Sequence, residues 1–185
     1  QKEKSLPSWL FYDAEGDRLF QQIMKMPEYY LTNCEYDIFQ QNKEDILSII
    51  SADAEGFNLV EFGAGDGLKT EILLKHFIDK DTNFNYKPVD ISENVLNLLQ
   101  ERMQKSIPQL DIKPVNKEYF EALDTLNEAR KNPMVVLFMG GNIGNFRFRD
   151  AVSFVNQIAN KLRTGDRIIM GFDMKKDPDM ILSAY

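Results

Sequence analysis

Three glycines and two carboxylates are the residues of this sequence best suited to hold a ligand. Gly63, Gly65 and Gly67 follow Glu61 within one short stretch, and Asp90 comes 23 residues after Gly67. Glycines lack the Cβ atom that would block positive φ angles or keep a ligand away from the backbone. A carboxylate about 20 residues after such a turn is placed to accept hydrogen bonds from ribose hydroxyls. The pattern indicates a platform for a ligand that contains a nucleoside.

A strand and a helix must position this turn. The run Phe57–Phe62 is typical of a buried parallel strand, and Ile72, Leu73 and Phe77 have helical spacing directly after the glycines. A helix that begins there leaves free N–H donors beside the turn. From Gly56 onward strands and helices alternate, which predicts an α/β domain whose parallel sheet is covered on both faces.

The same patterns predict the remaining elements of the sheet domain. The second strand ends at Asp90, and the later strands are expected at Leu110–Val115, Met134–Met139 and Arg167–Phe172. Met134–Met139 is the most apolar run and is expected inside the sheet. Ser92 is predicted to open one helix. The helix between the last two strands is expected to bury Val152, Val155, Ile158, Ala159 and Leu162.

Residues 1–55 precede the sheet pattern and are predicted to form an N-terminal helical cap over its ligand edge, whereas residues 56–185 are predicted to form the ligand-binding α/β core. The second cap helix is expected to begin with a capping box over Thr32–Glu35. His76, the only histidine, lies on the helix after the glycine turn, and a solvated or capping role is expected for it rather than a catalytic one.

The composition of the chain disfavours some classes of partner and predicts the cellular compartment. The chain of 185 residues fits one domain, and its net charge of −7 with scattered Lys and Arg disfavours a nucleic-acid partner. No stretch approaches the about 20 apolar residues that span a membrane. Cys34 is the single cysteine, which excludes an intramolecular disulfide, and no Cys/His cluster suggests a metal site. We expect a cytoplasmic protein without a nucleic-acid or membrane partner.

The spacing of the glycines separates two classes of ligand. A dinucleotide turn has the pattern G-x-G-x-x-G, but the third glycine here comes one residue early and Leu68 holds its position, which disfavours a nicotinamide oxidoreductase. Gly-x-Gly-x-Gly after an acidic strand residue instead resembles the nucleotide turn of class I S-adenosylmethionine (SAM) methyltransferases. The resemblance implies SAM as the cofactor and a Rossmann-like parallel sheet.

Further segments resemble one family of these enzymes, the histidine-specific SAM-dependent methyltransferases. They are Ser5–Pro7, Phe11–Asp13, Leu19-Phe20, Pro27–Tyr30, Glu61–Gly63, Val89–Ser92, Ile143–Asn145, Asp173, Lys176–Pro178 and Ala184-Tyr185. Members of the family methylate the α-amine of histidine on the way to ergothioneine, or the amine of a prenylated tryptophan. The resemblance therefore implies a SAM-dependent N-methyltransferase acting on the α-amine of an amino acid. The alternative is a SAM-binding scaffold or sensor without catalysis.

The residues at positions that match the family's motifs are the expected site residues of this chain. For the cofactor, besides Gly65 and Gly67, the resemblance implies Gly63, Lys69, Asp90, Glu118 near the adenine amine and Tyr119 near its ring. For the substrate it implies Tyr12 near the amine, Tyr29 against the side chain, Asn145 on the amine and carboxylate, and Tyr185 on the carboxylate. Asn145 would position the amine, and Tyr12 would assist its deprotonation through water.

The sequence departs from the family pattern in three places. Glu118-Tyr119 replaces the usual Asp-Phe pair, and Gly140–Asn142 replaces Gly-Ser-Thr before Ile143–Asn145. Sheets of this class normally gain two further strands at the edge beside the fifth strand, and these C-terminal strands are missing here. The exposed edge is expected to be covered, either by a continuation of the native chain past Tyr185, which we favour, or by a pairing chain.

Overall fold

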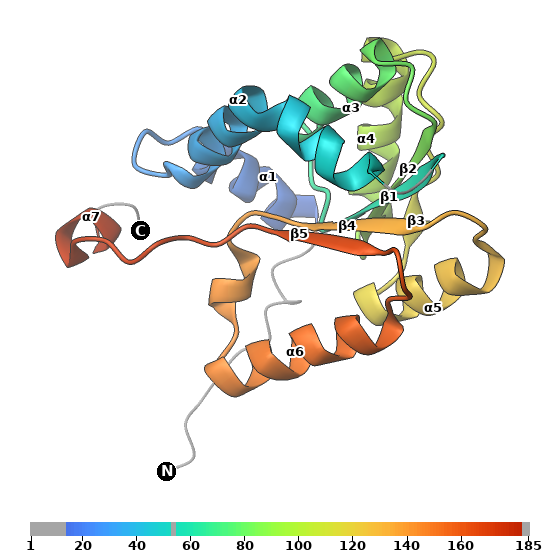
Figure 1. The fold of residues 1–185 in the computed structure, drawn as a ribbon. Helices are drawn as coiled ribbons and strands as arrows, with labels where there is room; N and C mark the ends of the chain where they lie inside the picture. Colours follow the sequence, from blue (N-terminus) through green and yellow to red (C-terminus); the bar gives the residue numbers. More distant parts are fainter. Residues whose placement is uncertain (1–13, 53–54, 183–185) are drawn as a thin grey trace.

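The computed structural model describes residues 14–52 and 55–182, which form a five-stranded parallel sheet with helices on both faces (Figure 1). The strands are β1 (Phe57–Phe62), β2 (Phe84–Asp90), β3 (Val115–Asn116), β4 (Met134–Phe138) and β5 (Arg167–Met170). Their order across the sheet is β3-β2-β1-β4-β5, so β4 lies inside the sheet as expected. The α/β prediction is confirmed.

The helices form two layers. They are α1 (Ala14–Ile23), α2 (Leu31–Ser51), α3 (Thr70–Asp79), α4 (Glu93–Ser106), α5 (Tyr119–Ala129), α6 (Phe148–Lys161) and α7 (Pro178–Leu182), with a 3-10 helix η2 (Asn142–Asn145). In Figure 1, α2, α3 and α4 lie above the sheet, and α5 and α6 lie below it. No helix within the described residues is both long and apolar enough to cross a bilayer.

Burial on both faces explains why β1 and β4 are almost continuously apolar. Phe57 and Leu59 of β1 pack with Phe39 of α2 and with α3 and α4, whereas Val60 and Phe62 face α5 and α6. α2 thus shares a core cluster with the sheet. The division into a cap at residues 1–55 and a core at 56–185 stays a prediction.

The third strand is shorter than expected. Before Val115 the expected segment pairs through an isolated bridge between Ile112 and Tyr86, and regular β3 begins only at Val115, opposite Val89. Lys113 N–H still donates to Tyr86 O at 2.8 Å. Pro114 follows, and because proline has no N–H it cannot continue the ladder.

Two helix predictions were wrong and one was confirmed. Val152 and Val155 of α6 are 46% and 41% exposed, and Ala159 is exposed as well. Ile158 is buried as expected, and Phe154 also packs into the core, 4.9 Å from the Phe138 ring. The larger ring buries more apolar surface, which turns the valines toward solvent. The capping box is absent, because α2 begins at Leu31 without a side-chain cap. Ser92 does cap α4 by accepting from Val95 N–H at 3.3 Å.

A buried ion pair joins the end of α5 to the strands β4 and β5. Asp166 accepts hydrogen bonds from Arg130 Nη2 at 2.6 Å, from Met134 N–H at 2.7 Å and from Arg163 N–H at 2.6 Å. Burial opposes the charge of Asp166, but these hydrogen bonds outweigh it and hold the pKa of the carboxyl below its usual value. Its contribution to stability is therefore present above the unfolded-state pKa and is lost as the pH falls through the folded-state pKa.

Asp166→Asn is expected to lower the free energy of unfolding by about 3–5 kcal/mol at neutral pH, because Arg130 would keep a buried charge without its partner. Urea unfolding measures the change. Glu121→Gln removes one partner of the exposed pair with Lys117 and should cost under about 1 kcal/mol. Equal costs for the two variants would contradict the assignment of Asp166 as a structural anchor.

Candidate functional site

The glycine turn and Asp90 lie side by side at the carboxyl ends of the strands. Gly63 N–H donates to Val89 O at 2.9 Å, which places the turn directly against the last residues of β2. Asp90 Oδ1 accepts Ser92 N–H at 3.0 Å, and Asn116 of β3 donates to Asp90 O at 3.0 Å. The ends of three neighbouring strands therefore meet at one edge.

The glycines of the turn have different neighbours. All three have positive φ, from 53° to 65°, which side-chain-bearing residues rarely adopt. A Cβ added at Gly67 would meet Leu99 Cδ1 at 2.5 Å and Met103 Cε at 2.8 Å, so this glycine lets the turn pack closely against α4. A Cβ at Gly65 would meet nothing within 4 Å. The turn therefore packs tightly at Gly67 and leaves open space at Gly65, as a backbone cradle for a ligand requires.

Glu61 lies buried beneath the turn at 3% exposure. It accepts hydrogen bonds from Thr70 Oγ1 and the Tyr86 hydroxyl, both at 2.5 Å. Burial raises the pKa of Glu61 to about 7, against the opposing effect of these two hydrogen bonds and of the Lys69 charge. The acidic strand residue thus ties β1 to α3 and β2 and does not line the open side of the turn.

Glu118 and Tyr119, the two residues predicted to contact adenine, differ in their exposure to solvent. The Tyr119 ring stacks on Phe62 with centroids 4.6 Å apart, and its hydroxyl lies 3.1 Å from the position that a Cβ on Gly63 would take. Glu118 is exposed at the residue before α5. Tyr119 therefore borders the glycine turn, and Glu118 faces solvent beside it.

Glu35 is a site residue that the sequence reasoning did not identify. Its carboxylate forms an ion pair with the Lys69 ammonium after the glycine turn and accepts Gly140 N–H at 2.6 Å in the loop after β4. Glu35 is 7% exposed, so both interactions are shielded from water. The sequence had placed this carboxylate in a capping box. It instead fixes α2 over the ends of β1 and β4.

A second contact fixes the start of α2. The Tyr30 hydroxyl donates to Asp173 Oδ2 at 2.6 Å, and Lys176 Nζ lies 4.6 Å from the centre of the Tyr30 ring. Tyr29, the preceding residue, packs edge-on against Phe20 with ring centroids 6.3 Å apart. The aromatic loop before α2 is therefore held beside the segment that follows β5.

The remaining substrate residues are only partly described. Asn145 ends η2 and is exposed, three residues after Asn142, whose side chain donates to Met139 O at 2.9 Å. The Asn142 amide nitrogen lies 4.0 Å from a Cβ built on Gly63, so the loop after β4 approaches the glycine turn. Tyr12 and Tyr185 lie outside the described residues.

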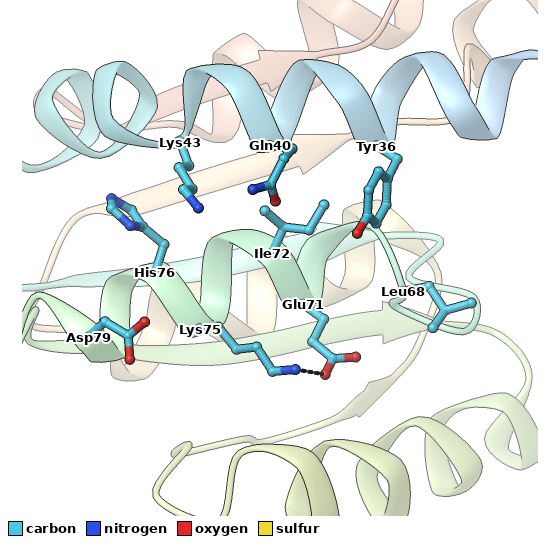
Figure 2. Close-up of a pocket in the computed structure, with 9 residues that line it drawn as sticks. All are labelled: Tyr36, Gln40, Lys43, Leu68, Glu71, Ile72, Lys75, His76 and Asp79. Carbon is cyan, nitrogen blue, oxygen red and sulfur yellow. Dashed lines mark ion pairs between the residues drawn. The ribbon is translucent and has the colours of Figure 1, made fainter.

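A groove of about 440 Å³ lies between α2 and α3, behind the turn. Figure 2 shows Tyr36, Gln40 and Lys43 reaching from α2 toward α3. His76, expected to be solvated, is only 6% exposed, and its Nε2 lies 3.4 Å from Glu44 Oε2.

One wall of this groove supports the glycine turn. Glu71 pairs with Lys75 at 2.7 Å and with Arg102, and Arg102 donates to Asp66 O within the turn at 2.6 Å. Figure 2 marks the pair of Glu71 and Lys75 with a dashed line. Glu71 therefore supports the glycine turn through Arg102.

This combination of sheet order, glycine turn and acid at the end of β2 defines a class I SAM-dependent methyltransferase fold. The open side of Gly65 and the adjacent Asp90 fit an adenosyl ligand. Magnesium protoporphyrin IX methyltransferase from Synechocystis PCC 6803, crystallised with SAM, shares the fold with a TM-score of 0.54 at 12% identity over 87% of this chain and 74% of that one. A SAM-dependent methyltransferase structure from Methanococcus maripaludis gives a TM-score of 0.52 at 14% identity, over 100% of this chain and 72% of that one.

The chain belongs to the family of SAM-dependent, histidine-specific methyltransferases, whose pattern it matches over residues 1–185. It is 32% identical to histidine N-alpha-methyltransferase of Mycolicibacterium smegmatis over 98% of this chain and 55% of that protein. It is 30% identical to ergothioneine biosynthesis protein 1 of Schizosaccharomyces pombe over 100% of this chain and 24% of that protein. A 4-dimethylallyltryptophan N-methyltransferase of Claviceps purpurea is 27% identical over 98% of this chain and 55% of that protein. The chain thus spans about half the length, or less, of these relatives.

The raised pKa of Glu61 gives a testable dependence of stability on pH. Its folded-state pKa, about 7, lies above the ordinary value of 4.5 expected in the unfolded chain, so the folded protein binds more protons between these two values. The contribution of protonated Glu61 to stability should therefore be fully present below about pH 4.5 and should be lost as the pH rises through about 7. Glu61→Gln should flatten this part of the curve, measured by urea unfolding at each pH. An unchanged slope in the variant would contradict the assignment.

Proposed function

We propose that this protein transfers a methyl group from SAM to the α-amine of an amino acid, histidine or a related amine. The observation that carries the proposal is the hydrogen bond from Gly63 N–H to Val89 O, which sets an open glycine turn beside Asp90. The choice of an amine is supported by relatives named for N-methylation of histidine and of dimethylallyltryptophan.

In this proposal the cofactor is held by the backbone of the glycine turn and by Asp90, which accepts hydrogen bonds from the ribose hydroxyls. Tyr119 and Glu118 are proposed to contact the adenine, since Tyr119 borders Gly63 and Glu118 is next to it. Lys69 is proposed as a further cofactor residue. Its ammonium is already paired with Glu35, so Glu35 would orient it.

Bound SAM would supply a methyl group on a sulfonium, ready for in-line displacement by a neutral amine. The protein's part is to orient the amine and to remove its proton, because an ammonium has no lone pair. We propose that Asn145 holds the amine and carboxylate and that Tyr29 contacts the substrate side chain. Tyr12, through water, is proposed to assist deprotonation, and Tyr185 to bind the carboxylate.

Two further features belong to the proposal. We propose that another polypeptide segment or chain covers β5, which in the described part of the chain pairs only with β4 and leaves Ile168 37% exposed. We also propose a cytoplasmic location. It is supported by Cys34, an exposed free thiol of the kind that persists in a reducing compartment.

Asp90→Asn should weaken binding of S-adenosylhomocysteine about tenfold or more, because a charged acceptor for two ribose hydroxyls becomes a neutral amide. Isothermal titration calorimetry measures the affinity. Asp45→Asn changes an exposed carboxylate on α2 and should leave the affinity unchanged. The assignment of Asp90 fails if both variants bind alike.

Asn145→Ala should lower kcat/KM for methyl transfer about 100-fold or more, with SAM affinity within about twofold of the original, because the substrate amine loses its orientation. Methyl transfer to a panel of amino acids measures the rate, and Asn156→Ala on the exposed face of α6 is the control.

Loss of cofactor binding together with turnover in Asn145→Ala would overturn this division of roles. SAM binding by the unaltered protein without methyl transfer to any amine of the panel would support the scaffold or sensor alternative instead.

A further inference from the structure

The carboxylate of Glu35 lies against the loops that follow three different strands. Its Oε1 accepts Gly140 N–H at 2.6 Å after β4, and its Oε2 pairs with the Lys69 ammonium after the turn that follows β1. After β5, a Cβ built on Gly171 would fall 2.6 Å from Glu35 Oε1. Glu35 therefore lies buried where the ends of β1, β4 and β5 meet.

Two of these loops carry residues proposed for the two reactants. Lys69 is proposed to contact the cofactor. The loop that begins at Gly140 ends at Asn145, which is proposed to hold the substrate amine. This loop is tied to itself, since Gly144 N–H donates to Gly141 O at 2.8 Å. A displacement of Gly140 is therefore passed on to Asn145.

Gly171 leaves the space that the carboxylate occupies. The φ angle of Gly171 lies outside the left-handed region, so the backbone at this position could carry a side chain without strain. However, an added Cβ would meet Met139 Cε at 3.3 Å as well as Glu35 Oε1. Gly171 N–H also donates to Phe138 O at 2.9 Å, which holds the residue beside β4. An alanine here would displace the Glu35 carboxylate without removing its charge.

We propose that Glu35 is a positioning residue for the methyl transfer described above, and this inference rests on that proposed function. One carboxylate fixes Lys69 on the cofactor side relative to Gly140 on the substrate side, and so aligns the amine with the methyl group. In the transfer, the amine first loses its proton to water. Its lone pair then forms the N–C bond as the C–S bond breaks, and the electron pair of that bond passes to sulfur. Glu35 takes no part in these bonds and contributes alignment, to which an in-line displacement is steeply sensitive.

The first test is steady-state kinetics with SAM and the amino acid that the unaltered protein methylates fastest. Glu35→Gln keeps an acceptor for Gly140 N–H but loses the charge that holds Lys69. It should lower kcat about tenfold or more, with both KM values within about threefold of the original. Asp37→Asn changes an exposed carboxylate on the same helix and should leave kcat unchanged. An unchanged kcat in Glu35→Gln, or a loss of SAM affinity alone, would overturn the proposal.

Gly171→Ala separates alignment from folding, because it keeps both charges of the buried ion pair and displaces only the carboxylate. In protein shown by thermal unfolding to be folded, it should lower kcat about tenfold by itself. Combined with Glu35→Ala it should lower kcat no further than Glu35→Ala alone, since the added methyl group then meets no carboxylate. A merely structural role would lower the melting temperature and leave kcat of the folded variants intact, and losses that multiply in the double variant would equally refute the proposal.

The proposed function and the role of Glu35 can fail separately. Absence of methyl transfer by the unaltered protein would refute the proposed function. NMR spectra of the ¹⁵N-labelled protein with saturating S-adenosylhomocysteine then decide whether Glu35 sets the loop. The backbone amide signals of Gly140 and Asn145 should both move in Glu35→Gln and stay in place in Asp37→Asn. Signals that stay in place in Glu35→Gln would contradict the inference whether or not the protein transfers a methyl group.

Discussion

The pairing of β1 with β2 is the constraint on which the rest of the structure depends. The register runs from Phe57 opposite Phe84 to Phe62 opposite Val89, and the Gly63 N–H bond to Val89 O continues it into the turn. Because parallel strands end at the same edge, this register sets the glycines and Asp90 side by side. A slip by one residue would move the side chains of β1 to the opposite faces of the sheet and separate the site.

Polar contacts from the start of α2 are the second constraint on the loops at this edge of the sheet. Glu35 joins Lys69 after the glycine turn to the backbone of Gly140 after β4, while Tyr30 contacts Asp173 after β5. The Glu35 side chain is 7% exposed. Without both partners its carboxylate would be an unpaired buried charge, which would strongly destabilise the folded state. Helix α2 is therefore coupled to the loops where methyl transfer is proposed, although it lies outside the sheet.

The two ends of the sheet differ in chemistry. At the carboxyl end, backbone N–H groups and the Asp90 carboxylate surround open space at Gly65. At the amino end, Lys87, Arg130 and Lys131 line a cavity. β1 and β2 contribute residues to both ends of the sheet.

The sequence alone determined the strand, turn and helix around Gly63–Gly67, the Ser92 cap and the location of Asp90 at the end of its strand, because each depends on neighbours a few residues away. Only the tertiary structure decided what depends on distant partners. It gave Glu35 to Lys69 and Gly140 instead of a capping box, buried His76 against α2, and turned Phe154 rather than Val152 into the core. Local periodicity cannot rank such alternatives, since long-range packing and burial of charge outweigh the small free energies of caps and helix faces.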